Sequence, residues 1–525
     1  MLRFLSWHMM LEWKSGFFKS QHVRCNSVVS YNAQRQTFAK PFSEVPRIPA
    51  LPLLGSSWIY LPLVGGYDKY DINKSAWQMY RRYGPIVAET LAGRRVIVHL
   101  FDADDFRTLY QEEGKTPYRM GAQPFKLYHD RRPQNFANPG IINAQGEEWR
   151  QIRTMFQPST LRPRTVQTYA DGIGQVVSDL LDLITASRDE NGDVADCNII
   201  MNRWALESIT AVSLGRRLGL LEKHNWRDLP AFRVFQAVED IFAGLDAMVT
   251  KFPYYRYVPT PTSRRFEKAG DTLVPLLWRF TKEAIDAAQA EGENSPNTTL
   301  LHHANRNQKA HIKELFTFIH DLIISGANTT GAAASMALQR LATNPEVQER
   351  ARQEVTASFS AKCQKESESS IETELPFLKA CIRETLRFHP IIPGVNLKLK
   401  QDVIMSGYQI PAGTVMRTEL FVAGQLEQHF TRPSEFLPER WLRSTDSPSE
   451  DAWTLHPFAS LPFGIGPRTC IGRKIAEMEL CSLLAAVLTR YKVENHHGDI
   501  GYRTQSTGRP ERPAKFRFIE LNTTT

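Results

Sequence analysis

The chain has 525 residues, of which 42% are apolar and 23% charged, a balance that allows a large core and excludes wholesale disorder or a small disulfide-stapled scaffold. Its six cysteines show no paired or CxxC spacing, which argues against a zinc ribbon and favours reduced thiols in an intracellular compartment. Residues 1–40 carry five of the eight excess positive charges, so the remainder is too weakly basic to predict nucleic-acid binding.

Residues 1–35 are predicted to form a mitochondrial transit-like leader, followed by one domain over residues 36–525. Large apolar side chains alternate in residues 2–20 with Arg3, Lys14 and Lys19, and Glu12 is the single acid. Basic, acid-poor, amphipathic segments are typical of import signals. The alternative is a flexible or membrane-skimming N-terminus. No window reaches the ~18 apolar residues that a membrane-spanning helix needs, so no anchor is predicted.

The periodicity predicts a mainly α-helical protein with small β-sheets. Two hairpins are expected, one from Ile86–Leu91 and Arg95–Leu100, the other from Val403–Ile410 and Thr414–Thr418 around Pro411-Ala412-Gly413. The clearest helix is His311–Thr343, which Asn344-Pro345 ends. At 1.5 Å per residue it would span about 50 Å, enough to cross a whole domain.

A glycine-rich loop over residues 463–472 precedes a second predicted helix, Arg473–Tyr491. A cysteine just before a helix N-terminus lies near unpaired N–H groups and the positive end of the helix dipole. These lower the thiol pKa and favour a thiolate, so we expect Cys470 to be anionic. Gly464, Gly466 and Gly472 allow a close approach to the backbone. The alternative is a buried structural cysteine.

This loop resembles the haem-binding signature FxxGxRxCxG of the cytochrome P-450 family, matched by Phe463, Gly466, Arg468, Cys470 and Gly472. Two further motifs, in the family's order, extend the resemblance to about residues 40–525: ExxR at Glu384–Arg387 and PERW at Pro438–Trp441. The resemblance implies the cytochrome P-450 fold, a single large domain with a long central helix over the haem. It implies haem b as cofactor and Cys470 as the iron ligand.

The ExxR and PERW motifs also have a physical interpretation. Glu384 and Arg387 are three residues apart on one predicted helix, and Arg440 would arrive from a loop. Such a charge-assisted network can pin the segment that leads to the cysteine. We expect its loss to release the cofactor.

Trp149 and Arg153 fit the family's WxxxR helix, which implies that they hold a haem propionate. Their i,i+4 spacing places an indole N–H and a guanidinium on one helix face. Arg468 and Lys398 are further propionate candidates. Without the resemblance, a stacked surface pair would be the simpler interpretation.

Residues 325–330 (Ser-Gly-Ala-Asn-Thr-Thr) match the family's oxygen-activation segment except at its acid. The resemblance implies that Gly326 thins the helix wall over the iron and that Thr329 relays protons. Asn328 replaces the usual acid, and an amide cannot supply a titrating proton. Either a water chain delivers protons, or some oxygen leaks as peroxide. The alternative for Thr329 is a hydrogen bond to the preceding helical turn.

Lys379 and Arg383 lie four residues apart on the ExxR helix and would share one exposed face. The resemblance to the mitochondrial class implies that they dock an adrenodoxin-like [2Fe–2S] ferredoxin, itself reduced by an NADPH-dependent reductase. Arg473 and Lys474 would extend this basic face. A solvated face without a partner is the alternative.

The function implied by the resemblance is monooxygenation of an apolar, sterol-like small molecule, with electrons from NADPH through the ferredoxin. The enzyme would lie on the matrix side of the mitochondrial inner membrane as a peripheral protein. The alternatives are a detoxifying mitochondrial monooxygenase, an electron-independent haem-thiolate isomerase or dehydratase, and a carrier without activity. By position, the substrate would contact five segments, 118–128, 235–252, 318–327, 391–396 and 504–507.

Overall fold

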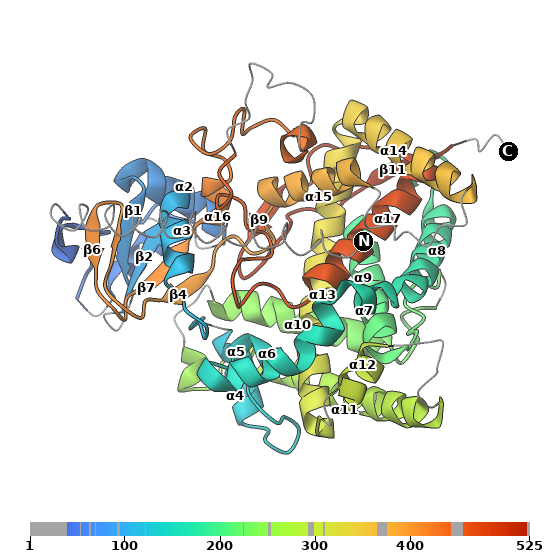
Figure 1. Ribbon diagram of the computed structural model, residues 1–525, viewed down its shortest axis with the longest axis horizontal. Coiled ribbons are helices and arrows are strands. Elements are labelled where there is room, and N and C mark those ends of the chain that lie inside the picture. Colours follow the sequence, from blue (N-terminus) through green and yellow to red (C-terminus); the bar gives the residue numbers. More distant parts are fainter. Residues whose placement is uncertain are drawn as a thin grey trace, which may run out of the picture.

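The computed structural model describes residues 39–521 apart from short internal gaps (Figure 1). The described ranges are 39–52, 54–61, 65–68, 70–91, 95–120, 122–223, 225–249, 254–291, 299–307, 310–364, 375–442 and 455–521. The predicted leader over residues 1–35 lies outside them. Within the described part of the chain, none of the helices combines the length and the apolar character that crossing a bilayer requires.

Helices dominate the described residues, as the periodicity predicted. The α-helices are α2 (Ile72–Tyr83), α3 (Ala103–Gln111), α4 (Gln123–Asp130), α5 (Gly140–Asn143), α6 (Gly146–Leu161), α7 (Pro163–Gln167), α8 (Ala170–Ser187), α9 (Cys197–Leu214), α10 (Phe232–Val249), α11 (Pro261–Glu291), α12 (Leu300–Asn307), α13 (Ile312–Ala342), α14 (Pro345–Gln364), α15 (Pro376–Phe388), α16 (Leu420–Ala423) and α17 (Arg473–Arg490). Short 3-10 turns are η1 (Phe42–Glu44), η2 (Ser56–Tyr60), η3 (Tyr254–Arg256) and η5 (Pro438–Trp441).

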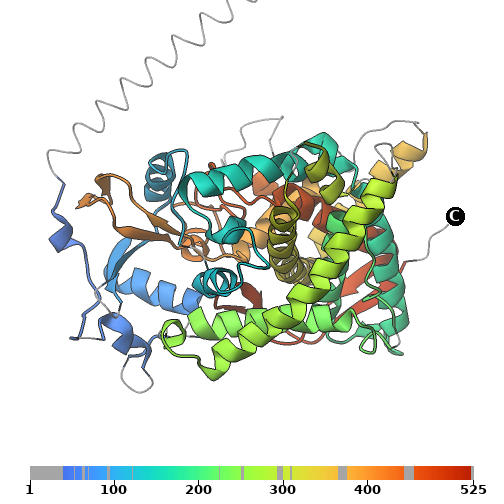
Figure 2. The ribbon, with the colours of Figure 1, turned by 90° about the horizontal axis from the view of Figure 1, so that it is seen from below.

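The strands form small sheets. They are β1 (Ile86–Thr90), β2 (Val96–Leu100), β3 (Asp193–Val194), β4 (Asn396–Lys398), β5 (Val403–Met405), β6 (Tyr408–Ile410), β7 (Val415–Thr418), β8 (Tyr491–Glu494), β9 (Tyr502–Thr504), β10 (Gly508–Pro510) and β11 (Phe516–Glu520). The largest sheet has the order β1-β2-β7-β4, in which β2 and β7 are parallel and the other neighbours antiparallel. The β-rich part occupies one end of the molecule, and α11 crosses the helical remainder in Figure 2.

The first predicted hairpin is confirmed by the antiparallel pairing of β1 with β2, but the second is wrong. Val403–Ile410 folds on itself as β5 and β6 around Ser406-Gly407, whose positive φ angles make a tight turn. Thr414–Thr418 instead contributes β7, which lies between β2 and β4. The two-residue turn at Ser406-Gly407 therefore closes a shorter hairpin than the one predicted around Pro411-Ala412-Gly413.

The long central helix is confirmed as α13, at whose N-terminus His311 and Glu314 form a capping box. The helix ends at Ala342, and Pro345 begins α14. The predicted helix Arg473–Tyr491 is one residue shorter, because Tyr491 already begins β8.

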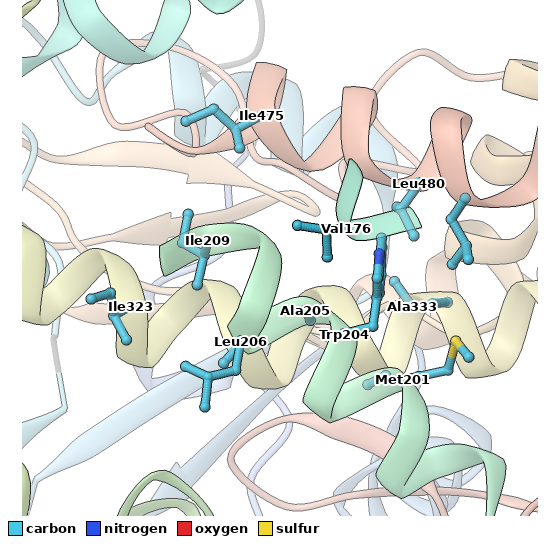
Figure 3. Close-up of a cluster of buried hydrophobic side chains, with 14 of the residues drawn as sticks. Val176, Met201, Trp204, Ala205, Leu206, Ile209, Ile323, Ala333, Ile475 and Leu480 are labelled. Atoms are coloured by element: carbon cyan, nitrogen blue, oxygen red, sulfur yellow. The ribbon is translucent and has the colours of Figure 1, made fainter. Parts of the chain in front are cut away.

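Packing around α13 fixes the positions of α9 and α17. In Figure 3, Trp204, Met201 and Leu206 of α9 pack against α13, and Leu480 of α17 faces the same core from the other side. Gly331 of α13 allows this close approach, because a Cβ there would lie 3.0 Å from the Cα of Asn202. A helix buried on nearly every side is held by its neighbours and can support a site precisely.

A buried charged cluster surrounds His99 on strand β2 of the largest sheet. His99 Nδ1 lies 2.7 Å from Glu419 Oε1, and His99 Nε2 lies 3.1 Å from Glu89 Oε2. Burial lowers the pKa of His99, but the hydrogen bonds to Glu419 and Glu89 outweigh it and raise the pKa to about 9. His99 is therefore a cation between two carboxylates at neutral pH.

This cluster predicts a pH-dependent stability. The folded pKa of His99 exceeds its unfolded value of about 6.5, so its contribution, of the order of 3 kcal/mol, is complete below that pH and is lost as pH rises through about 9. The free energy of unfolding, measured from pH 6 to 10, should fall over that window in the wild type and fall less in His99→Gln. His496→Gln, at an exposed histidine, is the control. Identical pH profiles for wild type and His99→Gln would contradict this assignment.

Candidate functional site

The loop that carries Cys470 is folded back on itself. Gly464 and Gly466 both have positive φ angles, and the Cys470 N–H donates to the Phe463 carbonyl at 2.8 Å. The Thr469 N–H donates to the Gly466 carbonyl at 3.1 Å. Gly472 is the N-cap of α17, so Cys470 stands just before the helix, as predicted from the sequence.

The prediction of a lowered thiol pKa is wrong for the protein atoms alone. Burial raises the pKa of Cys470, although the Gly472 N–H, Arg153 and Arg473 each lower it. Yet the Cys470 side chain keeps accessible surface. We infer that this accessible surface lines the space, here called the hollow, between the cysteine loop and α13, which approaches the loop at Leu322. A metal cation bound at the sulfur would reverse this pKa balance, because coordination deprotonates a thiol.

A narrow stripe of α13 borders the same hollow. From Leu315 to Gln339 every residue is buried except Ser325, Gly326 and Thr329, which share one helix face. Leu322, one turn earlier, places its Cδ1 4.0 Å from where a Cβ of Gly472 would lie, next to the cysteine loop. The accessible stripe therefore continues from the point where α13 meets that loop.

The polar groups of this stripe have defined partners. The Thr329 hydroxyl donates to the Ser325 carbonyl at 2.7 Å, which is the back-bonding that the sequence left open. Asn328 is buried, and its Oδ1 accepts a hydrogen bond from the Thr507 hydroxyl at 3.5 Å. Gly326 also allows α9 to approach, since a Cβ there would lie 3.0 Å from Ile209 Cγ1.

The predicted triad of Glu384, Arg387 and Arg440 is present and fully buried. Arg387 Nε and Nη2 donate to the two oxygens of Glu384 at 3.0 and 2.8 Å. Arg440 Nε donates to Glu384 Oε1 at 3.0 Å. A fourth member, Trp441, was not predicted: its indole N–H donates to Glu384 Oε2 at 2.8 Å. Its position beside Arg440 in the PERW motif could have indicated that it belongs to the triad.

The two arginines also bind the backbone that approaches the cysteine loop. Arg387 donates to the carbonyls of Gly424 and Pro433 at 2.6 and 2.9 Å. Arg440 donates to the Thr431 carbonyl at 2.8 Å. Every charge is thus paired and hydrogen-bonded, which is the condition for tolerating charges in a protein interior.

A basic cluster lies beside the hollow. Arg153 Nη1 donates to the Thr469 carbonyl at 2.8 Å, and the Arg468 guanidinium lies 4.5 Å from the centre of the Trp149 ring. Arg468 also donates to the Ala144 carbonyl. Lys398 lies apart from these residues, on strand β4 beside Tyr118.

One buried carboxylate, Glu113, acts on this cluster: it pairs with Arg119 and raises the pKa of Arg468, but burial and the neighbouring cations outweigh it. Burial, helped by the cations Arg119 and Arg153, lowers the pKa of Arg468 to about 10, and Arg468 Nε is buried with no hydrogen-bond partner among the described residues. Burial also lowers the pKa of Arg153. Both guanidiniums would gain from a ligand carboxylate. A thiol, an indole and two under-neutralised arginines around one hollow fit a flat, metal-containing ligand with acidic side groups.

The basic face has two parts. On α15, Lys379 is half-buried and Arg383 is exposed. At the start of α17, Arg473 Nε lies 2.8 Å and Lys474 Nζ 3.1 Å from the carboxylate of Glu477. Helices α15 and α17 pack together, so the two parts are neighbours, but Glu477 partly neutralises the second.

The five segments expected to contact substrate meet one another in space. The Met120 N–H donates to the Asn396 carbonyl at 3.3 Å, and the Gly508 N–H donates to the Ile391 carbonyl at 2.7 Å. The Ser506 N–H donates to Asp246 Oδ1 at 2.9 Å, which joins the C-terminal segment to α10. Together with the Thr507 contact to Asn328, these bonds bring the segments to α13.

Comparison with known proteins agrees with this geometry. The family model described as Cytochrome P450 matches residues 49–518. The chain is 32% identical over 491 residues to "Probable cytochrome P450 49a1" of Drosophila melanogaster, which covers 91% of this chain and 83% of that protein. It is 31% identical to "Probable cytochrome P450 12a5, mitochondrial" and 28% identical to "Cytochrome P450 302a1, mitochondrial", both from Drosophila melanogaster; each alignment covers 92% of this chain, and 92% and 96% of those proteins.

The buried triad predicts that removing Arg440 destabilises the protein far more than removing an arginine from an exposed ion pair. Arg440→Gln removes one of the two buried guanidiniums that bind Glu384, together with its hydrogen bond to the Thr431 carbonyl, and breaking a buried ion pair costs about 3–5 kcal/mol. Arg350→Gln is the control, because the Arg350–Glu439 pair is exposed and is worth less than about 1 kcal/mol. Urea unfolding, with cofactor absorbance recorded in parallel, should show a large loss of stability and of bound cofactor for Arg440→Gln. Equal effects of the two substitutions would contradict the role of the triad.

Proposed function

Because the chain belongs to the cytochrome P450 family, and so is a monooxygenase with haem held by a cysteine thiolate, we propose that it is a mitochondrial, ferredoxin-dependent hydroxylase of an apolar, sterol-like substrate. The observation that carries the proposal is that Cys470 and the stripe of Ser325, Gly326 and Thr329 on α13 both keep accessible surface where α13 meets the cysteine loop. A thiolate on one side and a thinned helix on the other provide room for a haem with substrate above it.

The residues around this hollow fit the cofactor. Cys470 would supply the axial thiolate, while Arg153, Arg468 and Trp149 would bind the propionates. When bound, the haem supplies oxygen activation, which a thiolate ligand favours by donating electron density to the iron. Phe463 packs against the main core and keeps the cysteine loop in place. Gly466 and Gly472 leave the face of the loop free of side chains.

We propose that protons reach the site through water that Thr329 holds in position. Its hydroxyl hydrogen is engaged by the Ser325 carbonyl, but Oγ1 retains lone pairs that can accept a hydrogen bond from water on the accessible stripe. Asn328 is buried against Thr507 and carries no titrating proton. Ordered water, with Thr329 as its positioning residue, therefore replaces the usual acid in our proposal.

The electron donor is proposed to be an adrenodoxin-like ferredoxin, reduced in turn by an NADPH-dependent reductase. Lys379 and Arg383 offer positive charge on α15, which packs against α17, and α17 begins next to Cys470. Arg473 and Lys474 add charge there, weakened by Glu477. An acidic partner docked on this side would place its cluster on the thiolate side of the haem.

The proposed location is the matrix side of the mitochondrial inner membrane, with peripheral attachment. Two of the relatives named above carry the word mitochondrial in their names. The composition of residues 1–35 suits an import leader, and residues 36–525 would then form the mature haem domain.

The substrate is proposed to be a sterol-like apolar molecule. Ile392 is a large apolar side chain that stays exposed, and it follows Ile391, which is hydrogen-bonded to Gly508 of β10. Apolar linings with few polar groups are typical of sites for large lipophilic ligands. The sterol class itself rests on what the mitochondrial members of the family do.

A spin-state titration tests the substrate class. We expect one sterol, steroid or secosteroid to shift the Soret band of the ferric enzyme from low to high spin with tight, saturable binding, because a fitted ligand displaces water from the hollow. Weak shifts with many unrelated apolar compounds would contradict this proposal and favour a detoxifying enzyme.

Charge reversal tests the electron donor. Lys379→Glu with Arg383→Glu should raise the ferredoxin concentration for half-maximal turnover at least about tenfold, because like charges would face each other across the interface. The affinity for substrate in the spin-state titration should not change. Lys282→Glu, on the exposed surface of α11, is the matched control and should leave both values unchanged. An unaltered ferredoxin dependence in the double variant would rule out docking at this place.

A further inference from the structure

A second cluster of metal-ligating side chains lies away from Cys470. His129 lies in the last turn of α4, and His320 and Asp321 are consecutive residues of α13. One ligand atom from each of the three lies within 4.8 Å of the others, and all three side chains are almost completely buried. No part of the oxygenase site described above uses them.

The two imidazoles lack ordinary partners. Neither ring nitrogen of His129 or of His320 makes a well-formed hydrogen bond within the described residues, and Asp321 Oδ2 is likewise unpaired there. Phe136 stacks on the His129 ring at 3.9 Å and meets the His320 ring edge-on at 5.0 Å. Burying several polar atoms unpaired among aromatic rings is unfavourable, so their positions call for a ligand.

Their protonation states suit a cation. Burial lowers the pKa of His129 to about 4 and that of His320 to about 3, so both rings are neutral at physiological pH and keep a lone pair for a metal. Burial raises the pKa of Asp321 to about 6, while His129 and the Ile142 and Ile141 N–H groups oppose the rise. Asp321 Oδ1 lies 3.6 Å from His320 Nδ1.

We propose that His129, His320 and Asp321 bind one Zn²⁺ ion. Two imidazole nitrogens and a carboxylate oxygen form a donor set typical of zinc, whereas Mg²⁺ and Ca²⁺ prefer all-oxygen sites. The fourth ligand position would fall to water or to a backbone carbonyl. The Pro139 backbone acts on His129 as a hydrogen-bond acceptor that raises its pKa, so it would hold one ring N–H while the other ring nitrogen binds the ion.

The ion would fasten the α4–α5 segment to the central helix. The Ala137 N–H already donates to the Thr317 hydroxyl of α13 at 3.1 Å. Gly140 lies so close that a Cβ there would come within 2.1 Å of Asp321 Oδ2. This segment continues into Ala144, whose carbonyl accepts a hydrogen bond from Arg468. Zinc binding would thus also stabilise the basic cluster beside the hollow.

Elemental analysis of the full-length, haem-loaded enzyme tests the proposal. After equilibration with zinc chloride and passage over a chelating resin, the wild type should retain one zinc per chain. His129→Gln and His320→Gln should each weaken zinc binding at least about 100-fold, measured by competition with a chromophoric chelator. Wild-type protein that retains only trace zinc, or variants that retain as much as the wild type, would overturn the proposal.

Two further measurements guard against misfolded variants and surface binding. His496→Ala removes an exposed histidine of an adjacent pair and should leave the zinc content unchanged; loss of zinc in this variant would instead place the ion at the surface. X-ray absorption at the zinc edge of the wild type needs no variant. It should show nitrogen and oxygen neighbours at about 2.0–2.2 Å with imidazole scattering, and a shell without imidazole would contradict the assignment.

Discussion

The rest of the site depends on the buried interaction of the Glu384 carboxylate with Arg387 and Arg440. The carboxylate accepts hydrogen bonds from Arg387, Arg440 and Trp441 with no exposure of the charged groups to solvent. The same arginines hold backbone carbonyls from Gly424 to Glu435. Because a buried charge is tolerated only when it is fully paired, these residues must keep one arrangement, and that arrangement leads the chain toward the cysteine loop.

Two opposing surfaces then define where chemistry can occur. The cysteine loop is shaped by backbone turns at Gly464 and Gly466, and α13 is buried from Leu315 to Gln339 apart from one narrow stripe. Packing of α9 and α17 against α13 sets the distance between these surfaces. At Arg153 and Arg468, burial and neighbouring cations outweigh the charge of Glu113, so both guanidiniums would gain from the carboxylates of an acidic cofactor.

Much of this could be predicted from the sequence because it depends on local signals. The ends of α13 follow from a capping box and a proline, and the triad follows from fixed spacings. The failures have tertiary causes. In the absence of a bound metal, burial raises the pKa of Cys470, and the two-residue turn at Ser406-Gly407 pairs β5 with β6 in place of the expected hairpin. His129 and His320 are 191 positions apart, so no sequence spacing could have indicated their contact.

The most direct test of the account is the absorption spectrum of the reduced enzyme under carbon monoxide, compared between wild type and Cys470→Ser. We expect the wild type to show the absorption band that is characteristic of thiolate-bound haem iron, and Cys470→Ser to lose it. Cys197→Ser should keep the band, because this buried cysteine lies in α9 and its thiol donates to the Val194 carbonyl at 3.3 Å, a bond that serine can also make. A thiolate-type band that persists in Cys470→Ser would show that Cys470 is not the iron ligand.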